Sequence, residues 1–170
     1  MSQFPFYQQQ DAMDCGPTCI RMIAKHYGRS VGINMLKTQS EYNRDGVSVL
    51  GISMASEGIG FKSLAVNVTL SEIMEAPLPC ILHWNQNHFV VLYKVGKNKV
   101  IIGDPGKGIL KLSKQDFRQG WMSDTAEQRG IALLLEPTAT FYQRENDIDK
   151  KMGWSILTNY TLRYKAQIFQ

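Results

Sequence analysis

The feature that most constrains the fold is a change in the hydrophobic pattern along the chain. Up to about residue 60, apolar residues recur at helical spacing, whereas most later segments are short and rich in β-branched and aromatic residues. Helices are predicted at 15–28, 33–39, 48–57, directly after Thr69 and at 113–119. Strands are predicted at 61–68, 80–84, 88–95, 99–103, 108–112 and 130–135. Helices first and an antiparallel sheet afterwards indicate an α+β fold rather than alternating parallel units.

Composition and charge exclude several broad classes of protein. The 170 residues are 44% hydrophobic and 20% charged, which is typical of one folded domain rather than a disordered chain. The net charge of +4 is spread without a basic stripe, so no nucleic-acid partner is expected. No apolar run approaches the ~18 residues that a membrane-spanning helix needs. No Gly-x-x-x-x-Gly-Lys-Ser/Thr loop occurs, so the chain is not expected to hydrolyse nucleotides itself.

The chain changes character after Pro137. Residues 137–170 are polar and charged through Lys151 and then rich in aromatic residues, and no acid follows Asp149. We therefore predict one domain over residues 1–136 and an appendage outside the core over residues 137–170. The alternative for the end of this segment is an ordinary surface helix.

The three cysteines, Cys15, Cys19 and Cys80, are an odd number, and no signal peptide precedes them. A disulfide framework is therefore not expected, and a reducing compartment is. Free thiols are then available for chemistry. Zinc binding is the alternative use of such residues, but zinc sites usually show paired clusters such as Cys-x-x-Cys. The sequence has no such pair, so no metal site is expected.

Cys15 stands at the start of the first predicted helix, where Asp14 can cap the helix and Pro17 suits its first turn. The unpaired N–H groups of a helix N-terminus stabilise a thiolate, which is the attacking form of cysteine. Gly16 would let a substrate approach the backbone, and the Cys15 N–H could bind a developing oxyanion. The alternative is that Cys15 is only a small buried hydrophobe ahead of a helix.

A nucleophilic cysteine needs a base, and the sequence offers three histidines. His26 lies about 16 Å from Cys15 along an ideal helix, which is too far to serve it. His83 is interpreted as an ordinary residue of the sheet. His88 opens a strand directly after the polar run 85–87, at a sheet end, and is the best candidate for the base.

Asp104 ends the next strand, sixteen residues after His88. If the hairpin between them has a three-residue loop, Val95 faces Lys99, and Asp104 lies one diagonal step from His88 on the same face. The carboxylate could then orient the imidazole, as in a catalytic triad. The alternative is that this Asp-Pro pair only starts a turn.

A neutral side-chain donor precedes the cysteine. Gln9, six residues before Cys15, could add an N–H group to the oxyanion site. Gln8, Gln9 and Gln10 are consecutive, so spacing alone does not choose among them. A solvated polar run is the simpler explanation.

The segment QQDAMDCGPTCIRMIAKHYG at 9–28 closely resembles the double-glycine leader peptidases. These are papain-like cysteine peptidase domains at the N-terminus of bacterial peptidase-containing ABC transporters, including the bacteriocin-processing type. Their motif is a Gln six residues before an Asp-Cys-Gly cysteine, then a His-Phe/Tyr-Val-Val strand, then Asp-Pro sixteen residues after the His. This chain matches all three parts, and the resemblance covers about residues 1–136. It implies Gln9 as oxyanion donor, Cys15 as nucleophile, His88 as general base and acid, and Asp104 as its orienter.

The resemblance also implies a substrate. This would be a secreted peptide whose N-terminal leader ends in two glycines and is cut after the second, which suits a narrow cleft that a Cβ would block. The leader would dock as an amphipathic helix in an apolar groove. Met35 and Met54 are candidates for that groove, although core packing is the more usual role of methionine.

The implied partner is the rest of an ABC transporter. The peptidase would then work at the cytoplasmic face of the bacterial membrane, and residues 137–170 would lead toward a membrane domain beyond this chain. ATP would bind only in a separate domain outside the chain, and the peptidase itself would need no cofactor.

Two other functions are compatible with the fold. One is a leader-peptide docking module that does not cut; the presence of Gln9, Cys15, His88 and Asp104 argues against it, because docking requires none of them. The other is papain-fold acyl transfer to a nucleophile other than water.

Overall fold

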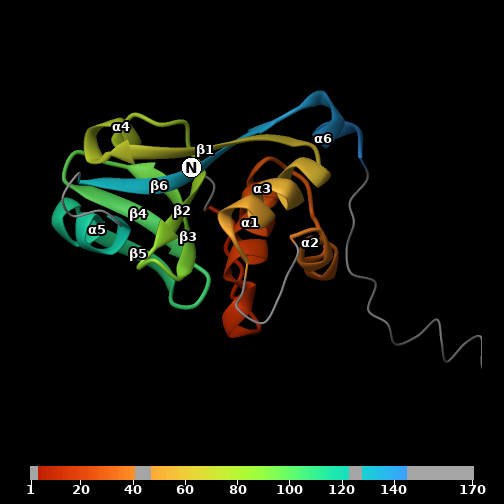
Figure 1. The fold of residues 1–170 in the computed structure, drawn as a ribbon, viewed down its shortest axis with the longest axis horizontal. Coiled ribbons are helices and arrows are strands. Elements are labelled where there is room, and N and C mark those ends of the chain that lie inside the picture. The colour runs from red at the N-terminus through yellow and green to blue at the C-terminus, as the bar shows by residue number, and fades with distance from the viewer. Residues whose placement is uncertain (1–3, 41–46, 123–127, 145–170) are drawn as a thin grey trace, which may run out of the picture.

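The structure, a computed structural model, describes residues 4–40, 47–122 and 128–144, in which a group of helices lies beside a curved sheet (Figure 1). The helices are the 3-10 helix η1 (Ala12–Asp14) and α1 (Cys15–His26), α2 (Ile33–Gln39), α3 (Val49–Gly58), α4 (Leu70–Met74), α5 (Lys114–Trp121) and α6 (Ala139–Gln143). The strands are β1 (Phe61–Thr69), β2 (Cys80–Trp84), β3 (His88–Val95), β4 (Lys99–Asp104), β5 (Gly108–Ser113) and β6 (Arg129–Pro137). Within these described ranges, no helix has the length and apolar character needed to cross a bilayer.

α1 begins at Cys15, as the sequence predicts, but the prediction that Asp14 caps it is wrong. The Asp14 side chain makes no hydrogen bond to the first turn of α1. It accepts the N–H of Asp11 instead and pairs with Lys37 on α2. The helix ends before Gly28, whose φ of +93° is readily available only to a residue without a Cβ.

Two other helices have the caps that their sequences indicate. The Ser48 hydroxyl accepts the N–H of Gly51 at the start of α3. Thr69 and Glu72 form the predicted capping box of α4, in which each side chain bonds to the backbone of the other residue.

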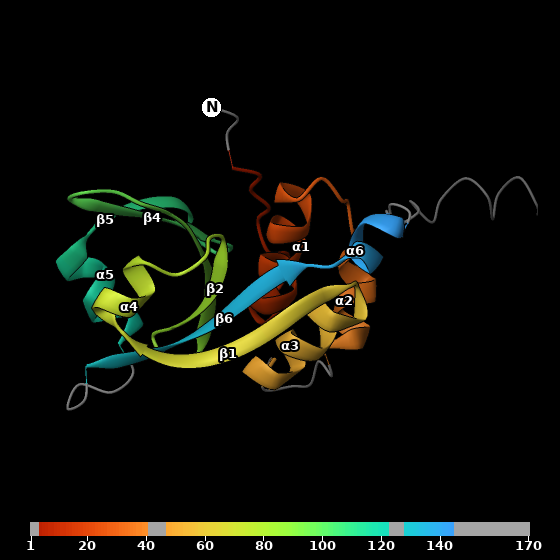
Figure 2. The ribbon, with the colours of Figure 1, turned by 90° about the horizontal axis from the view of Figure 1, so that it is seen from above.

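The six strands form one antiparallel sheet in the order β1-β6-β2-β3-β4-β5. β1 and β6 are the long strands and pair along their whole length, from Phe61 opposite Pro137 to Thr69 opposite Arg129. Seen from above, these two strands run from the rest of the sheet across to the helical group (Figure 2). They therefore join the two parts of the domain.

The β3–β4 hairpin reaches the predicted register by a route that the sequence did not predict. At the turn, Val95 pairs with Val100, one residue further along the chain than the predicted partner. A bulge at Tyr93 then shifts the register back, so that Val91 pairs with Gly103 as predicted. The ends of the two strands, which carry the predicted base and its orienter, are consequently adjacent.

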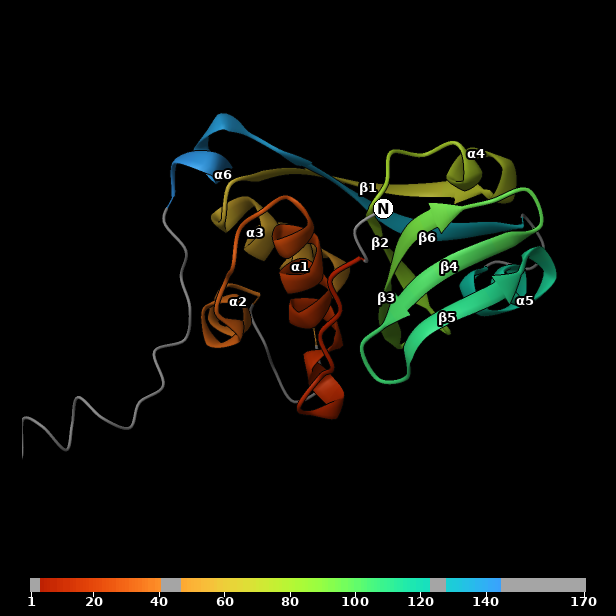
Figure 3. The same ribbon diagram turned by 180° about the vertical axis from the view of Figure 1, so that it is seen from behind.

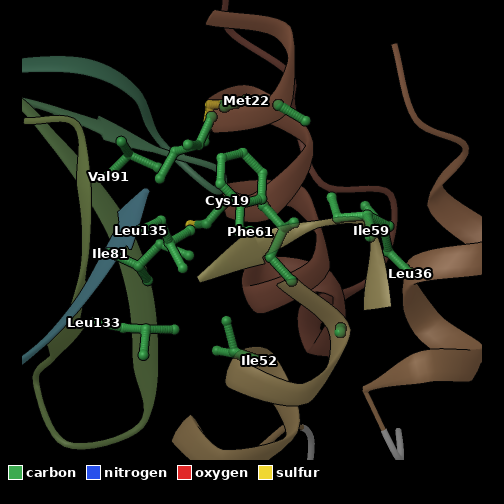
Figure 4. Close-up of a cluster of buried hydrophobic side chains, with 14 of the residues drawn as sticks. Cys19, Met22, Leu36, Ile52, Ile59, Phe61, Ile81, Val91, Leu133 and Leu135 are labelled. Carbon is green, nitrogen blue, oxygen red and sulfur yellow. The ribbon is translucent and has the colours of Figure 1, made fainter. Parts of the chain in front are cut away.

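Two apolar clusters lie on opposite faces of the sheet, and residues along β2 alternate between them. Ile81 belongs to the first cluster, whereas Leu82 belongs to the second. In the first cluster, side chains of the helical group meet side chains of the sheet (Figure 4), including Cys19, Met22, Ile52, Phe61, Val91 and Leu133. The second cluster packs the sheet against α5 through Phe117 and Trp121.

Every helix and strand predicted within the described residues is present, and the observed ends differ from the predicted ones by at most two residues. The α+β prediction is therefore confirmed. α6 was not predicted. Its Phe141 is fully buried, with a ring centroid 4.5 Å from that of Phe61, and Thr138 bonds to the Gly60 carbonyl. The prediction that the core ends at residue 136 is wrong for this helix, and residues 145–170 of the predicted appendage lie outside the described residues.

Candidate active site

Cys15 is the first residue of α1, and only 6% of its surface is exposed. The N-terminal end of α1 and the turn between β4 and β5 lie at the same end of the molecule (Figure 3). A Cβ added at Gly16 would lie 2.8 Å from Ile52 Cδ1 on α3. The packing of α1 against α3 thus leaves little room for a side chain here, and the substrate approach that the sequence analysis expected stays a prediction.

His88 and Asp104 lie at the adjacent ends of β3 and β4 and contact each other. The distance from His88 Nε2 to Asp104 Oδ1 is 2.7 Å. The same carboxylate oxygen accepts the backbone N–H of Gly106 at 2.9 Å, and Asp104 is almost fully buried. The prediction that these two side chains share a face, one diagonal step apart, is confirmed.

The pKa of His88 is raised to about 9 by its neighbours. Burial lowers the pKa, but the hydrogen bonds and negative charges of Asp104 and Cys15 outweigh burial. For Asp104, burial raises the pKa of the carboxyl, but the His88 bond and the Gly106 N–H outweigh it and hold that pKa below its ordinary value. The imidazole is therefore protonated and the carboxylate ionised near neutral pH.

The side chain of Cys15 is close enough to His88 to contribute to the raised pKa of the imidazole. Because Nε2 faces Asp104, Nδ1 is the ring nitrogen left for the thiol. The three side chains thus lie in a series in which the carboxylate can orient the ring and the ring can exchange a proton with the sulfur. Such a series can activate a nucleophile and later protonate a leaving group.

Of the three consecutive glutamines, Gln9 is the one tied to this site. Gln8 and Gln10 are exposed, whereas Gln9 is half-buried. The Gln9 backbone N–H donates to the Pro105 carbonyl at 3.0 Å, and its Nε2 donates to the Ala12 carbonyl at 3.3 Å. These contacts favour Gln9 over its two neighbours, and its role as oxyanion donor stays a prediction.

The other two cysteines are set apart from this chemistry by burial. Burial, together with the negative charges of Cys15 and Asp104, raises the pKa of the fully buried Cys19 thiol well above its ordinary value. Burial alone raises the pKa of Cys80 to about 12. Both therefore remain protonated thiols at neutral pH. Among the residues described by the structure, no group of three or more His, Cys, Asp or Glu side chains is arranged to hold a metal ion.

The other two histidines lie elsewhere. His26 is at the far end of α1 from Cys15, and its ring packs 5.4 Å from that of Phe4. His83 is in the middle of β2 with its ring 5.1 Å from that of Phe89, and burial lowers its pKa. These positions agree with the sequence analysis, which preferred His88 as the base.

Two supporting features were missed. The Gly106 N–H bonds to Asp104, and the sequence Asp-Pro-Gly could have revealed it, because an Asp side chain often bonds to the backbone N–H two residues on. The ion pair between Asp14 and Lys37 joins η1 to α2 at 2.7 Å. No local pattern reveals this pair, because its members are distant in the sequence.

The comparison with known proteins agrees with this geometry. The profile of the peptidase C39 family matches residues 3–139. This chain belongs to the peptidase C39 family. Its relatives include the colicin V secretion/processing ATP-binding protein CvaB of Escherichia coli, which is 30% identical over 137 residues. The lactococcin-G-processing and transport ATP-binding protein LagD of Lactococcus lactis is 36% identical over 140 residues.

Solved structures of C39 peptidase domains have the same fold. A double glycine motif protease from an AMS/PCAT transporter, in complex with the leader peptide, superposes with a TM-score of 0.73 and 28% identity, over 80% of this chain and 93% of that one. The peptidase domain of Streptococcus ComA, a bifunctional ABC transporter of a quorum-sensing pathway, gives a TM-score of 0.70 and 29% identity, over 80% of this chain and all of that one.

The C39 relatives are much longer than this chain. The match to CvaB covers 81% of this chain and 19% of CvaB, and the match to LagD covers 78% of this chain and 19% of LagD. The similarity is thus to one domain of each transporter.

Proposed function

We propose that this C39 domain is a cysteine endopeptidase that removes the N-terminal leader of a secreted peptide by cutting after a Gly-Gly pair. The observation that supports this most strongly is that Cys15, at the start of α1, acts on the pKa of His88, whose ring is hydrogen-bonded to Asp104. Binding a leader involves no proton transfer, so a docking module has no need of such a series. A peptidase needs all of it.

In the proposed reaction, the Cys15 thiolate attacks the carbonyl carbon of the second glycine. The resulting oxyanion accepts hydrogen bonds from the Gln9 amide and the Cys15 N–H. His88 gives its proton to the departing amine, which leaves an acyl-enzyme. His88 then removes a proton from water, the hydroxide attacks the thioester carbon, and the leader departs with a new carboxylate while the thiolate is restored. Asp104 holds the ring in the required tautomer throughout.

The names of the relatives support this substrate class. CvaB and LagD are described as secretion or transport proteins that also process, and one structural neighbour was solved with a leader peptide. Two glycines before the cut would suit a cleft too narrow for a Cβ. Residues with larger side chains would then be excluded because they clash with the walls of the cleft.

The leader would contact the exposed apolar side chains of α3. Leu50 and Met54 are 67% and 43% exposed and lie one helical turn apart, as an amphipathic partner helix requires. Of the two methionines proposed from sequence, Met54 therefore suits this role. Met35 is partly buried and packs against the first apolar cluster, as core packing would require.

The proposed partner is the remainder of an ABC transporter, with the peptidase domain at the cytoplasmic face of the membrane. The transport proteins among the relatives support this assembly. The proposed hydrolysis uses only side chains, backbone N–H groups and water. ATP would be bound in a domain outside this chain.

The direct test is cleavage of a synthetic precursor peptide with a Gly-Gly leader, followed by mass spectrometry. The wild-type chain should release a leader ending in a free carboxylate, and a precursor with Ala-Ala in place of Gly-Gly should stay intact. Cys15→Ala should bind the precursor with unchanged affinity and release nothing. Turnover by Cys15→Ala would refute the mechanism.

The same experiment separates the two rival functions. Binding without cleavage by the wild-type chain would favour a docking module. A leader whose mass includes an added amine or thiol nucleophile, rather than water, would favour acyl transfer.

A further inference from the structure

A buried negative charge stands directly beside the proposed nucleophile. Asp14 immediately precedes Cys15, and its side chain is fully buried. It does not cap α1, so the N–H groups of the helix do not compensate its charge. A carboxylate in this position opposes formation of a thiolate at the next residue, because like charges repel more strongly away from bulk water.

Lys37 supplies the opposite charge. Its Nζ lies 2.7 Å from Asp14 Oδ1, and the lysine side chain is 27% exposed while that of Asp14 is 1% exposed. The other carboxylate oxygen, Oδ2, accepts the backbone N–H of Asp11 at 3.2 Å. Both oxygens of Asp14 are therefore occupied, one by a charge from α2 and one by the first turn of η1.

The same ion pair supports the turn to which the proposed oxyanion donor is attached. η1 is closed by the Asp14 N–H, which donates to the Asp11 carbonyl at 3.1 Å. The Gln9 amide donates to the Ala12 carbonyl within this turn. A change in the Asp14 carboxylate would thus reach Gln9 and Cys15 together.

The other titratable groups around the thiol do not replace Lys37. On β3, the positive charge of His88 balances one negative charge of the site. On β4, the Asp104 carboxylate adds a further negative charge. Lys107 acts on Asp104 from the β4–β5 turn. Cys19, on α1, is a neutral thiol, because burial raises its pKa.

We propose that Lys37 is a positioning residue of the peptidase: by neutralising the buried Asp14 carboxylate and fixing η1, it allows the Cys15 thiolate to form in mildly acidic and neutral solution. The inference rests on the proposed function, because it assumes that Cys15 is the nucleophile. Lys37 is not expected to touch the substrate. Its proposed effect on Cys15 is transmitted through Asp14.

The test is the alkylation rate of Cys15 by iodoacetamide as a function of pH, measured by peptide mass mapping. Lys37→Met should move the rising limb of the profile upward by roughly one pH unit, so that the rate at pH 6 falls about tenfold. Lys37→Arg should retain the wild-type profile, because a guanidinium also pairs with a carboxylate. Lys111→Met removes the same charge from the exposed middle of β5 and should leave the profile unchanged.

A second pair of variants separates charge from packing. Asp14→Asn alone leaves Lys37 in place and should move the profile to lower pH. Asp14→Asn combined with Lys37→Met removes both charges, keeps an oxygen to accept the Asp11 N–H, and should bring the profile back to that of the wild type. The inference is overturned if Asp14→Asn leaves the profile unchanged, or if the double variant stays as slow as Lys37→Met.

The outcome for the wild-type chain keeps this inference distinct from the proposed function. If wild-type Cys15 reacts at mildly acidic pH no faster than an ordinary thiol of pKa about 8.5, both the proposed Cys15–His88 pair and the role of Lys37 fail. If the wild type is fast and Lys37→Met is equally fast, only the role of Lys37 fails.

Discussion

At the scale of single residues, His88 is the group on which the proposed chemistry depends. Its partial burial alone would make it a weaker base, yet the Asp104 carboxylate and the Cys15 sulfur together raise its pKa to about 9. The ring therefore holds its proton at neutral pH, when the sulfur needs to be negative. In the proposed reaction, the protonated ring is ready to give its proton to the departing amine.

Asp104→Asn tests the orienting role of the carboxylate. The substitution keeps the shape of the side chain but removes its charge, so the pKa of His88 should fall and kcat/KM for a leader peptide should drop by roughly 10²- to 10⁴-fold. NMR titration of the His88 ring and steady-state cleavage would measure the two effects. Glu75→Gln, at an exposed position, is the matched control. A His88 titration that remains near pH 9 in Asp104→Asn would contradict this account.

Stability should depend on pH through the same pair. His88 has a higher pKa in the folded chain than its ordinary 6.5, so its contribution is complete below pH 6.5 and is lost as the pH rises through about 9. Asp104 has a lowered pKa, so its contribution is present above about pH 3.8 and is lost as the pH falls below that. The free energy of unfolding of the wild type, minus that of His88→Gln, should therefore decrease between pH 6.5 and 9. A difference that stays constant over that interval would disprove the coupling.

At the scale of helices and strands, local patterns predicted what local interactions determine. α2 and β2 have the predicted bounds, because the spacing of their apolar residues specifies their conformation. α6 was missed because its stability comes from tertiary contacts of Phe141, which its own sequence does not reveal. The capping role of Asp14 was wrong because a lysine of α2 binds its carboxylate.

The packing of α6 makes a testable contribution to the fold. Phe141→Ala removes a fully buried ring and should lower the free energy of unfolding by about 3–5 kcal/mol. Tyr142→Ala, at the next and 61% exposed position, should cost less than about 1 kcal/mol. Urea denaturation of both variants would measure these costs. Equal and small losses would mean that α6 is not part of the cooperative unit.

At the scale of the whole molecule, the proposed site belongs to neither part of the domain alone. The helical group carries Cys15 and the sheet carries His88 and Asp104, and the first apolar cluster between them fixes their separation (Figure 4). The reactivity of Cys15 should therefore depend on the contact between the two parts.

Unfolding in urea would show this dependence. Two probes would follow unfolding: the far-UV dichroism of the helices, and the fluorescence of Trp84 and Trp121 in the second cluster. Fast alkylation of Cys15 at pH 5.5 should be lost at a urea concentration no higher than that at which the first of these two signals changes. Leu133→Ala, within the first cluster, should move all three transitions to lower urea together. Fast alkylation that outlasts either transition would show that Cys15 does not need both parts.

How much of the site could be predicted depends on how far apart in the sequence the contacting residues lie. Cys15, His88 and Asp104 could be named because each stands at the end of an element whose conformation is locally determined. Spacing alone did not choose Gln9 over its neighbours, and only the family resemblance singled it out, because its bond to the distant Pro105 leaves no local pattern. Lys37 could not be found, because only the packing of α2 against α1 brings it to Asp14.

The bulge at Tyr93 gives the hairpin a practical property. It absorbs the extra residue of the turn. The alignment of His88 with Asp104 is therefore set by the pairing between the bulge and the strand ends, and not by the length of the loop at 96–98. The bulged residue also stacks its ring on Phe4, 4.2 Å away, and so helps to anchor the segment that leads to Gln9. The tip of this hairpin is accordingly a place where a fluorophore or an affinity tag can be inserted without disturbing the reacting groups.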